Sequence, residues 1–293
     1  MEMLHYDFMQ RAFCAGGLIA IIASLLGMYL MLRRQALMAD MLSHVSLAGV
    51  AGGAFIHIHP TLGGFVVATV GAVLVEYVRR SYKSFSEISV AIIMIGGLSS
   101  AVIIMSFSPS MNKGLSAYLF GSVVAVNETE LSLMLIVAAI GGLFFFLFRR
   151  QLYQITFDEE TARTNGIPVK WISLGFSVLT GMIVSAAMPI VGVLLVSSLI
   201  VLPAALAIRI AHSFTASLLI AMGVGLLGVF SGLTASYSFS TPPGGTIAIL
   251  LLLLLILGLG IQKAVVRFRK TTNKNIMEDK VPVPFIQTIR RNF

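Results

Sequence analysis

Residues 213–262 read SFTASLLIAMGVGLLGVFSGLTASYSFSTPPGGTIAILLLLLLILGLGIQ and contain no Asp, Glu, Lys or Arg. A helix crosses the hydrocarbon core of a bilayer, roughly 30 Å thick, with about 20 apolar residues. The stretch is therefore long enough for two crossings, with a Pro-Pro-Gly-Gly turn signal at 242–245 between them. Residues 12–32 and 171–208 also lack these four residue types. The sequence thus predicts an all-α, polytopic membrane protein.

The composition of the whole chain agrees with this fold class. Of its 293 residues, 57% are hydrophobic and 11% are charged, whereas soluble domains carry about a quarter charged residues. The net charge is +8, but its distribution indicates membrane topology rather than nucleic-acid binding. The one cysteine, Cys14, has no intrachain disulfide partner. The chain has no HExxH, P-loop or GxSxG motif, so we do not expect an enzyme.

Gly and Pro residues divide the apolar sequence into about nine predicted membrane spans. A further apolar segment, 114–127, is short for a crossing, and a re-entrant or an interfacial helix would suit its length. The nine predicted spans are 12–32, 36–57, 62–80, 88–107, 131–148, 171–188, 190–208, 214–237 and 244–266.

Basic residues set the expected orientation, because Lys and Arg stay on the cytoplasmic side of short loops. With the N-terminus outside and the C-terminus inside, only Arg11 and Lys113 among the basic residues are left outside. Residues 1–266 then form the membrane domain, with a cytoplasmic segment at 151–170, and residues 267–293 form a basic cytoplasmic tail. Neither hydrophilic segment is long enough for a soluble catalytic domain, so energy-consuming chemistry must come from another chain.

One acidic residue, Asp40, lies within the apolar pattern of a predicted span, and His44 follows four residues later. Residues i and i+4 share a helix face, so the two side chains point the same way. A carboxylate oxygen and an imidazole nitrogen suit a divalent transition metal such as Zn²⁺ or Mn²⁺. Three other interpretations are open: a structural pair that neutralises itself, a proton relay, or a carboxylate that reaches the inner surface near Arg34.

Other polar residues lie at the ends of predicted spans. His57 and His59 flank the outer end of the second span and could receive a metal there, or could be ordinary interfacial residues. Glu76 precedes Arg79 and Arg80 by three and four residues, a spacing that predicts a local ion pair.

The stretch PIVGVLLVSSLIVLPA runs from Pro189 to Ala204, with a second proline at 203. Proline interrupts the backbone hydrogen bonds of a helix, and carbonyl groups freed inside a protein can line a polar path. The same feature could simply kink a helix.

Three motifs, in order along the chain, resemble those of the bacterial ABC-importer permeases for zinc, manganese and iron. LRRQALMADMLSHVSLAGVAGG (32–53) resembles the family signature, in which an Asp-x-x-x-His pair precedes a segment of small residues. FDEETARTNGIPV (157–169) resembles the cytoplasmic coupling segment, and PIVGVLLVSSLIVLPAALAIRIA (189–211) resembles the later Gly and Pro-Ala-Ala motif. The resemblance covers residues 10–266. One departure is the loop SYSFSTPPGG (236–245), where many relatives carry an acid and this chain has Ser240 and Thr241.

The resemblance implies a fold similar to the cobalamin-type (type II) importer permeases, in a homodimer in the bacterial cytoplasmic membrane. Two cytoplasmic ATPase subunits would supply the energy, and an extracellular metal-binding protein would deliver the ion. No permanently bound cofactor is implied; the metal is the cargo. By position, Asp40 and His44 become metal residues, and residues 157–168 become the helix that contacts the ATPase. The residues that carry this coupling motif are Phe157, Asp158, Glu159, Ala162, Gly166 and Pro168.

The stretch MADMLSHVSLAG (38–49) is more similar to zinc-importing members than to manganese-importing ones. Zinc import is therefore the favoured function. One alternative is a manganese or iron importer of the same architecture. The other, from a different class, is an ion-coupled secondary carrier in which Asp40 binds a proton or sodium ion and no ATPase is needed.

Overall fold

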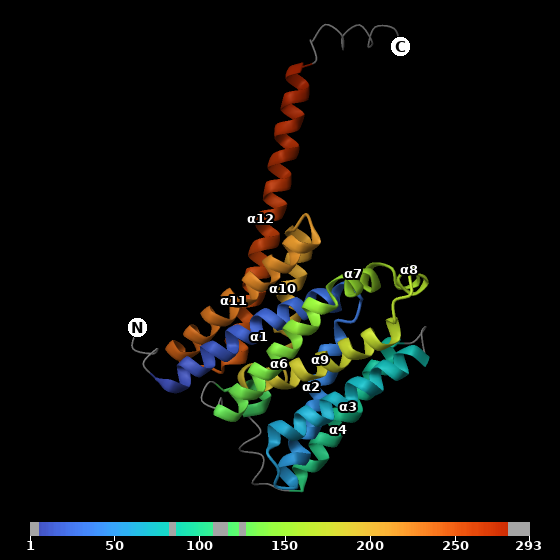
Figure 1. Cartoon of the computed structure of the whole chain (residues 1–293). Helices are drawn as coiled ribbons and strands as arrows, with labels where there is room; N and C mark the ends of the chain where they lie inside the picture. The colour runs from blue at the N-terminus through green and yellow to red at the C-terminus, as the bar shows by residue number, and fades with distance from the viewer. Residues whose placement is uncertain (1–5, 82–85, 108–116, 123–126, 281–293) are drawn as a thin grey trace.

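The structure is a computed structural model that describes residues 6–81, 86–107, 117–122 and 127–280. The described residues form helices and connecting turns, without a strand, as the sequence predicts (Figure 1). The helices are α1 (Asp7–Leu32), α2 (Leu37–Phe55), α3 (Pro60–Ser81), α4 (Ser86–Ser106), α6 (Glu128–Leu147), α7 (Arg149–Phe157), α8 (Glu159–Thr164), α9 (Val169–Val191), α10 (Val196–Ile210), α11 (Phe214–Phe239) and α12 (Pro243–Lys280).

Each of the nine predicted spans has its main overlap with a different helix, although the span 190–208 begins inside α9 and crosses the break before α10. Fewer than nine of these helices qualify as membrane spans. By length and composition, seven helices among the described residues are long and apolar enough to cross a bilayer: α1, α3, α4, α6, α9, α11 and α12. The helix α10 has only 15 residues. The helix α2 has 19 residues, among them the polar Asp40 and His44, and is not one of the seven. The expected count of about nine spans was therefore too high by this measure.

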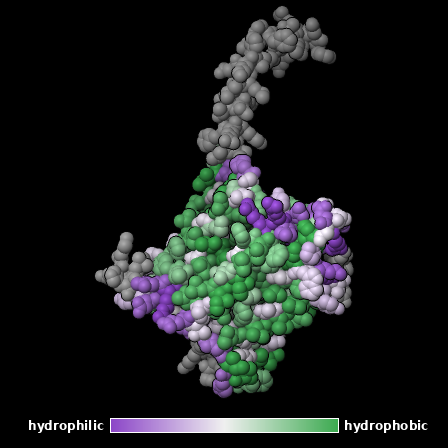
Figure 2. All heavy atoms as spheres, in the orientation of Figure 1, coloured by the Kyte–Doolittle hydropathy of each residue, from purple (hydrophilic) through white to green (hydrophobic). Residues whose placement is uncertain are grey.

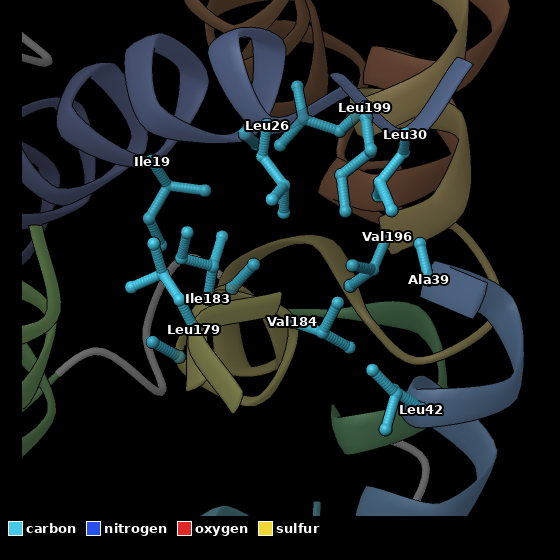
Figure 3. Close-up of a cluster of buried hydrophobic side chains, with 14 of the residues drawn as sticks. Ile19, Leu26, Leu30, Ala39, Leu42, Leu179, Ile183, Val184, Val196 and Leu199 are labelled. Carbon is cyan, nitrogen blue, oxygen red and sulfur yellow. The ribbon is translucent and has the colours of Figure 1, made fainter. Parts of the chain in front are cut away.

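The core of the bundle forms where α1, α9 and α10 meet. Figure 3 shows Ile19 and Leu26 of α1 directed toward Leu179 and Ile183 of α9, with side chains of α2 and α10 closing the cluster. The helices α1 and α9 are accordingly the most buried of the seven spans, and α4 and α12 are the least. In Figure 2 a broad hydrophobic surface separates a hydrophilic region over α7 and α8 from another near the starts of α1 and α6. This is the distribution that a protein crossing a bilayer requires.

The helices α2, α3 and α4 pack closely together beside this core (Figure 1). The contact between α2 and α3 depends on glycine: a Cβ on Gly49 would lie 2.4 Å from the carbonyl oxygen of Gly63. Small residues allow membrane helices to approach at backbone distance, where close packing replaces the hydrophobic effect. The position of α2 is therefore fixed mainly by α3 and α4.

The chain leaves the helical path between α9 and α10, after Pro189. Gly192 has φ of 85°, which favours glycine, and the amide of Val193 donates to the carbonyl of Tyr118 at 2.9 Å. In return, the amide of Ser122 donates to the carbonyl of Pro189 at 3.0 Å. The break thus frees backbone groups, as one interpretation of the sequence expected, and residues 117–122 pair with them.

This pairing bears on the short apolar segment 114–127. Residues 117–120 form a single helical turn, so the part of the segment that the structure describes rests against the α9–α10 break rather than crossing the membrane. Residues 114–116 and 123–126 lie outside the described residues.

A buried ion-pair cluster joins α3 to α9 at one end of the bundle. Glu76 is 2% exposed and pairs with Arg79 at 2.9 Å and Arg80 at 2.6 Å, which confirms the predicted local ion pair. Ser177 of α9 donates to the same carboxylate at 3.0 Å, and Arg80 donates to the carbonyl of Lys170. The C-terminal end of α3 therefore lies at the same end of the bundle as segment 151–170.

The helix α12 continues well past the predicted end of its span at residue 266. It runs without interruption to Lys280 and projects from the bundle (Figure 1). The predicted boundary between residues 266 and 267 therefore falls inside a helix. Residues 281–293 of the predicted tail lie outside the described residues.

Candidate functional site

Asp40 and His44 lie one turn apart near the N-terminal end of α2. The turn before α2 places Arg34 in the left-handed region, with φ of 57°, and the helix then begins at Leu37. Asp40 and His44 are both half-buried, while the residues between them are buried. The two polar side chains therefore share the one face of α2 that its neighbours leave partly open, as the i, i+4 spacing predicts.

Neither side chain of this pair has a polar partner among the described residues. The Ser43 hydroxyl donates to the backbone carbonyl of Asp40 at 2.7 Å, but the Asp40 carboxylate forms no hydrogen bond or ion pair there. The Nδ1 atom of His44 is buried and unpartnered. A structural pair would show an ion pair between Asp40 and His44, and the described ion pairs do not include one; nor does Asp40 pair with the exposed Arg34.

The open face of α2 continues beyond this pair at the same spacing. Asp40, His44, Ala48 and Gly52 are all half-buried, and each follows the last by four residues. A Cβ on Gly52 would meet no atom within 4 Å. The open face therefore carries two polar side chains near the start of α2 and small residues beyond them. The small residues leave room alongside α2 for an ion or for another chain.

One chain does not complete a metal site on this face. Within the described residues, His, Cys, Asp and Glu side chains nowhere gather in groups of three or more that could hold a metal ion. Asp40 and His44 supply one oxygen ligand and one nitrogen ligand, so further ligands would be backbone carbonyls, water or a second copy of the chain.

The structure separates the two histidines that the sequence placed together. His57 is exposed and lies in the left-handed region with φ of 58°. His59 is half-buried, and its Nδ1 atom is buried without a partner. It lines a cavity of about 200 Å³ together with Tyr118, Asn127 and Glu130. Of these two histidines, His59 is therefore the one whose ring nitrogen could bind a metal ion in this cavity.

Glu130 is a buried polar residue that the sequence did not single out. It is 4% exposed, accepts a hydrogen bond from Thr61 at 3.1 Å, and forms a capping box with Asn127 at the start of α6. The Asn-x-x-Glu spacing before an apolar run is the sequence signal for such a box. That signal predicts the cap, but not that α3 buries the carboxylate.

The coupling motif forms a shorter helix than the expected 157–168. The helix α7 ends at Phe157, and α8 covers only Glu159–Thr164. Asp158 separates the two and caps α8 by accepting from the amide of Thr161 at 3.0 Å. The Thr161 hydroxyl also donates to this carboxylate, and the hydrogen bonds from the hydroxyl and the amide of Thr161 hold the pKa of Asp158 below its usual value.

The two ends of α8 are held in different ways. Phe157 precedes it and packs its half-exposed ring against Tyr153, at 4.7 Å between centroids. Within α8, Ala162 is fully buried, and Glu159 pairs with Arg163 at 2.9 Å on the exposed side. After α8, Gly166 takes φ of 78°, and Pro168 precedes α9. The segment thus presents an exposed, charged, short helix on a fixed base.

These features define a class of protein: a polytopic helical membrane protein with two polar side chains on an open helix face and a short, exposed, charged helix at one end of the bundle. The sequence profile described as the ABC 3 transport family matches residues 5–262, and the chain belongs to that family. It is a transport subunit rather than an enzyme, since ATP hydrolysis in such transporters resides in a separate subunit.

Known relatives agree with this assignment. A "Probable metal transport system membrane protein" of Treponema pallidum is 36% identical over 248 residues, which cover 85% of this chain and 93% of the relative. The high-affinity zinc uptake system membrane protein ZnuB of Haemophilus influenzae is 27% identical, over 83% of this chain and 94% of its own. Other relatives are named for manganese and for chelated iron.

A solved structure shares the fold along most of the chain. PsaBC from Streptococcus pneumoniae, solved in complex with a Fab, contains a chain that matches with a TM-score of 0.79 and 26% identity, covering 88% of this chain and 93% of that one. The protein is therefore a permease of an ABC metal importer. Relatives named for zinc, manganese and iron all occur, so these similarities do not single out one metal.

Proposed function

We propose that this permease moves a divalent transition metal ion, Zn²⁺ in the first instance, into the cell by way of Asp40 and His44. The observation that carries the proposal is the pair of ligand side chains on the open face of α2, neither of which has a polar partner among the described residues. An ionised carboxylate within a membrane helix costs at least about 2.5 kcal/mol unless it faces a partner or water. A metal ion that passes along this face would be that partner.

The open face of α2 also supports a homodimer in which the path lies between two chains. One chain offers two metal ligands here, and a second copy would bring the total to the four that Zn²⁺ prefers. A site with so few ligands from each chain would come apart when the two chains move, and this suits cargo that must be released.

Energy and delivery would come from partner proteins. The short helix α8, exposed at one end of the bundle, is the element we assign to the groove of a cytoplasmic ATPase, with Phe157, Asp158, Glu159, Ala162, Gly166 and Pro168 shaping the contact. With this assignment, segment 151–170 and the C-terminus would lie inside the cell and the N-terminus outside. An extracellular metal-binding protein would then dock at the opposite end.

The choice of zinc rests on the residues around the pair rather than on the pair itself. One carboxylate and one imidazole accept Zn²⁺, Mn²⁺ or Fe²⁺. The stretch MADMLSHVSLAG is more similar to zinc-importing relatives. The ion-coupled carrier considered from the sequence is not retained, because the chain belongs to an ABC family.

Uptake measurements test this proposal. Cells that express the chain with its ATPase and delivery protein would be given radiolabelled Zn²⁺ and Mn²⁺ in parallel, with an ATPase-dead control. We expect zinc uptake that disappears in the control, and loss of uptake in Asp40→Asn and His44→Ala while both proteins insert and assemble. Glu87→Gln, which changes an exposed acid of α4, is the matched control. Normal uptake by both site variants would reject the assignment.

A further inference from the structure

The cavity lined by His59 and Glu130 has the chemistry of a second cation site, at the opposite end of α3 from Glu76. It is lined by the turn between α2 and α3, the start of α6, Tyr118 and Pro189. Its volume of about 200 Å³ accommodates a hydrated or partly hydrated ion. The cavity is separate from Asp40 and His44, which lie near the other end of α2.

The carboxylate of Glu130 is buried without a cation beside it. Oε1 accepts from the Thr61 hydroxyl and Oε2 from the amide of Asn127, each at 3.1 Å. Both donors are neutral, and among the described residues Glu130 forms no ion pair; Arg11 pairs with the neighbouring Glu128 instead. A carboxylate accepts about four hydrogen bonds, so two positions are left for a positive ligand. Burial makes an uncompensated charge costly, and a bound cation would remove that cost.

The second ligand is already present on the same cavity. The Nδ1 atom of His59 is buried and has no hydrogen-bond partner. In the tautomer that carries its proton on Nε2, Nδ1 offers a lone pair to a metal. An imidazole nitrogen and a carboxylate oxygen form the mixed ligand set that first-row divalent ions accept.

The site also lies at the expected side of the membrane. The C-terminal end of α3 carries Arg80, which contacts Lys170 in the coupling segment, whereas Pro60, next to His59, begins the helix. The 22 residues of α3 span about 33 Å at 1.5 Å per residue, close to the thickness of a bilayer core. If segment 151–170 is cytoplasmic, His59 and Glu130 are at the outer face.

We infer that His59 and Glu130 form a receiving site, where a divalent metal ion released outside first binds the permease before it moves to Asp40 and His44. The inference rests on the proposed function, because it takes the cargo and the orientation from it. With two protein ligands and water completing the shell, the site holds the ion weakly and passes it on. The exposed His57 has no part in it.

Direct binding separates this site from the first one. The full permease, assembled with its ATPase in nanodiscs, would be titrated with Mn²⁺ and the free ion followed by electron paramagnetic resonance. The starting protein carries Asp40→Asn and His44→Ala, so that the remaining binding reports the receiving site. We expect one Mn²⁺ bound per chain, and an increase in Kd of at least about tenfold, or about 1.4 kcal/mol, when Glu130→Gln is added. His59→Gln should do the same, and it serves as the test if Glu130→Gln fails to assemble.

A matched control lies two residues away on the same helix. Glu128→Gln removes an exposed acid, and we expect it to leave the Kd unchanged. Uptake then distinguishes the two proposals: receiving-site variants should raise the half-saturating metal concentration and keep most of the maximal rate. Unchanged binding and half-saturation in both variants would overturn this inference alone. Normal uptake by the Asp40 and His44 variants, with a shifted half-saturation for Glu130→Gln, would instead reject the first site and keep this one.

Discussion

Ser177 of α9 donates a hydrogen bond of 3.0 Å to Glu76 of α3, and the same buried carboxylate pairs with Arg79 and Arg80. One acid thus satisfies three donors from two helices. Its position at the end of the bundle near Lys170 means that α3, α9 and the base of the coupling segment are held by a single group. We therefore expect removal of the Glu76 carboxylate to lower the stability of the protein more than its metal binding.

The first prediction concerns this cluster. Glu76→Ala should lower the free energy of unfolding by about 2–3 kcal/mol, because it leaves two arginines and a buried hydroxyl without their acceptor. The loss is smaller than for a fully buried pair, since both arginines are partly exposed. Thermal unfolding of the purified permease in detergent measures it, with the exposed Glu87→Ala as the control. Equal melting temperatures for the two variants would contradict the prediction.

The second prediction concerns the α9–α10 break. Gly192→Ala should destabilise the protein by at least about 2 kcal/mol, because a side chain is strained at φ of 85° and its Cβ would lie 2.5 Å from the amide nitrogen of Gly121. Gly223→Ala, in α11, is the matched control, since its Cβ would meet no atom within 4 Å. The melting temperature of Gly192→Ala should fall and that of Gly223→Ala should hold or rise. Equal melting temperatures for Gly192→Ala and Gly223→Ala would contradict the prediction.

The third prediction concerns the open face of α2. Gly52→Leu should reduce metal uptake strongly without lowering stability, because a large side chain would fill the space beside Ala48 and His44 while leucine favours the helix. Gly96→Leu adds the same side chain to the exposed surface of α4, where a Cβ also meets no atom within 4 Å. Uptake rates of the two variants, normalised to the amount of assembled transporter, decide the matter. Similar rates would mean that the cargo does not pass along α2.

The fourth prediction concerns the cap of α8. Asp158→Ala should weaken the association of permease and ATPase, because α8 loses the acceptor that holds its first turn, whereas Asp158→Asn should keep most of it. The pKa of Asp158 is lowered from its ordinary value of 3.8, so the cap is fully present above that pH and is lost only as the pH falls through the lower value. Association measured by co-purification should therefore not change between pH 6 and 8 on account of this group. An Ala variant that retains the ATPase fully would rule out the role.

The helices could be predicted from the sequence because their cause is local. Runs such as 213–262 have the length and apolarity of membrane spans wherever they lie in the fold, and the i, i+4 spacing of Asp40 and His44 fixes their shared face. The outcome differs for α2: the sequence predicts a span at 36–57, but α2 is not among the seven helices that qualify by length and composition. The apolar run 190–208 likewise predicts a full span, but the break at Gly192 leaves α10 with only 15 residues.

Contacts between distant segments could not be predicted in the same way. The burial of Glu130 depends on Thr61 of α3, and the pairing of residues 117–122 with the α9–α10 break depends on where two turns meet in space. Neither leaves a periodic pattern in the chain. The motif predicted one helix over 157–168, but Asp158, in an extended conformation, separates α7 from the shorter α8.

The two polar side chains of α2 have a consequence for how the protein is made. A segment that carries Asp40 and His44 partitions poorly into lipid by itself, and Gly49 and Gly63 allow it to pack directly against α3. We therefore expect α2 to leave the translocon together with α3 as a hairpin, and not as a single helix. The two residues that we propose to bind the cargo would then depend for their insertion on a neighbouring helix during biosynthesis.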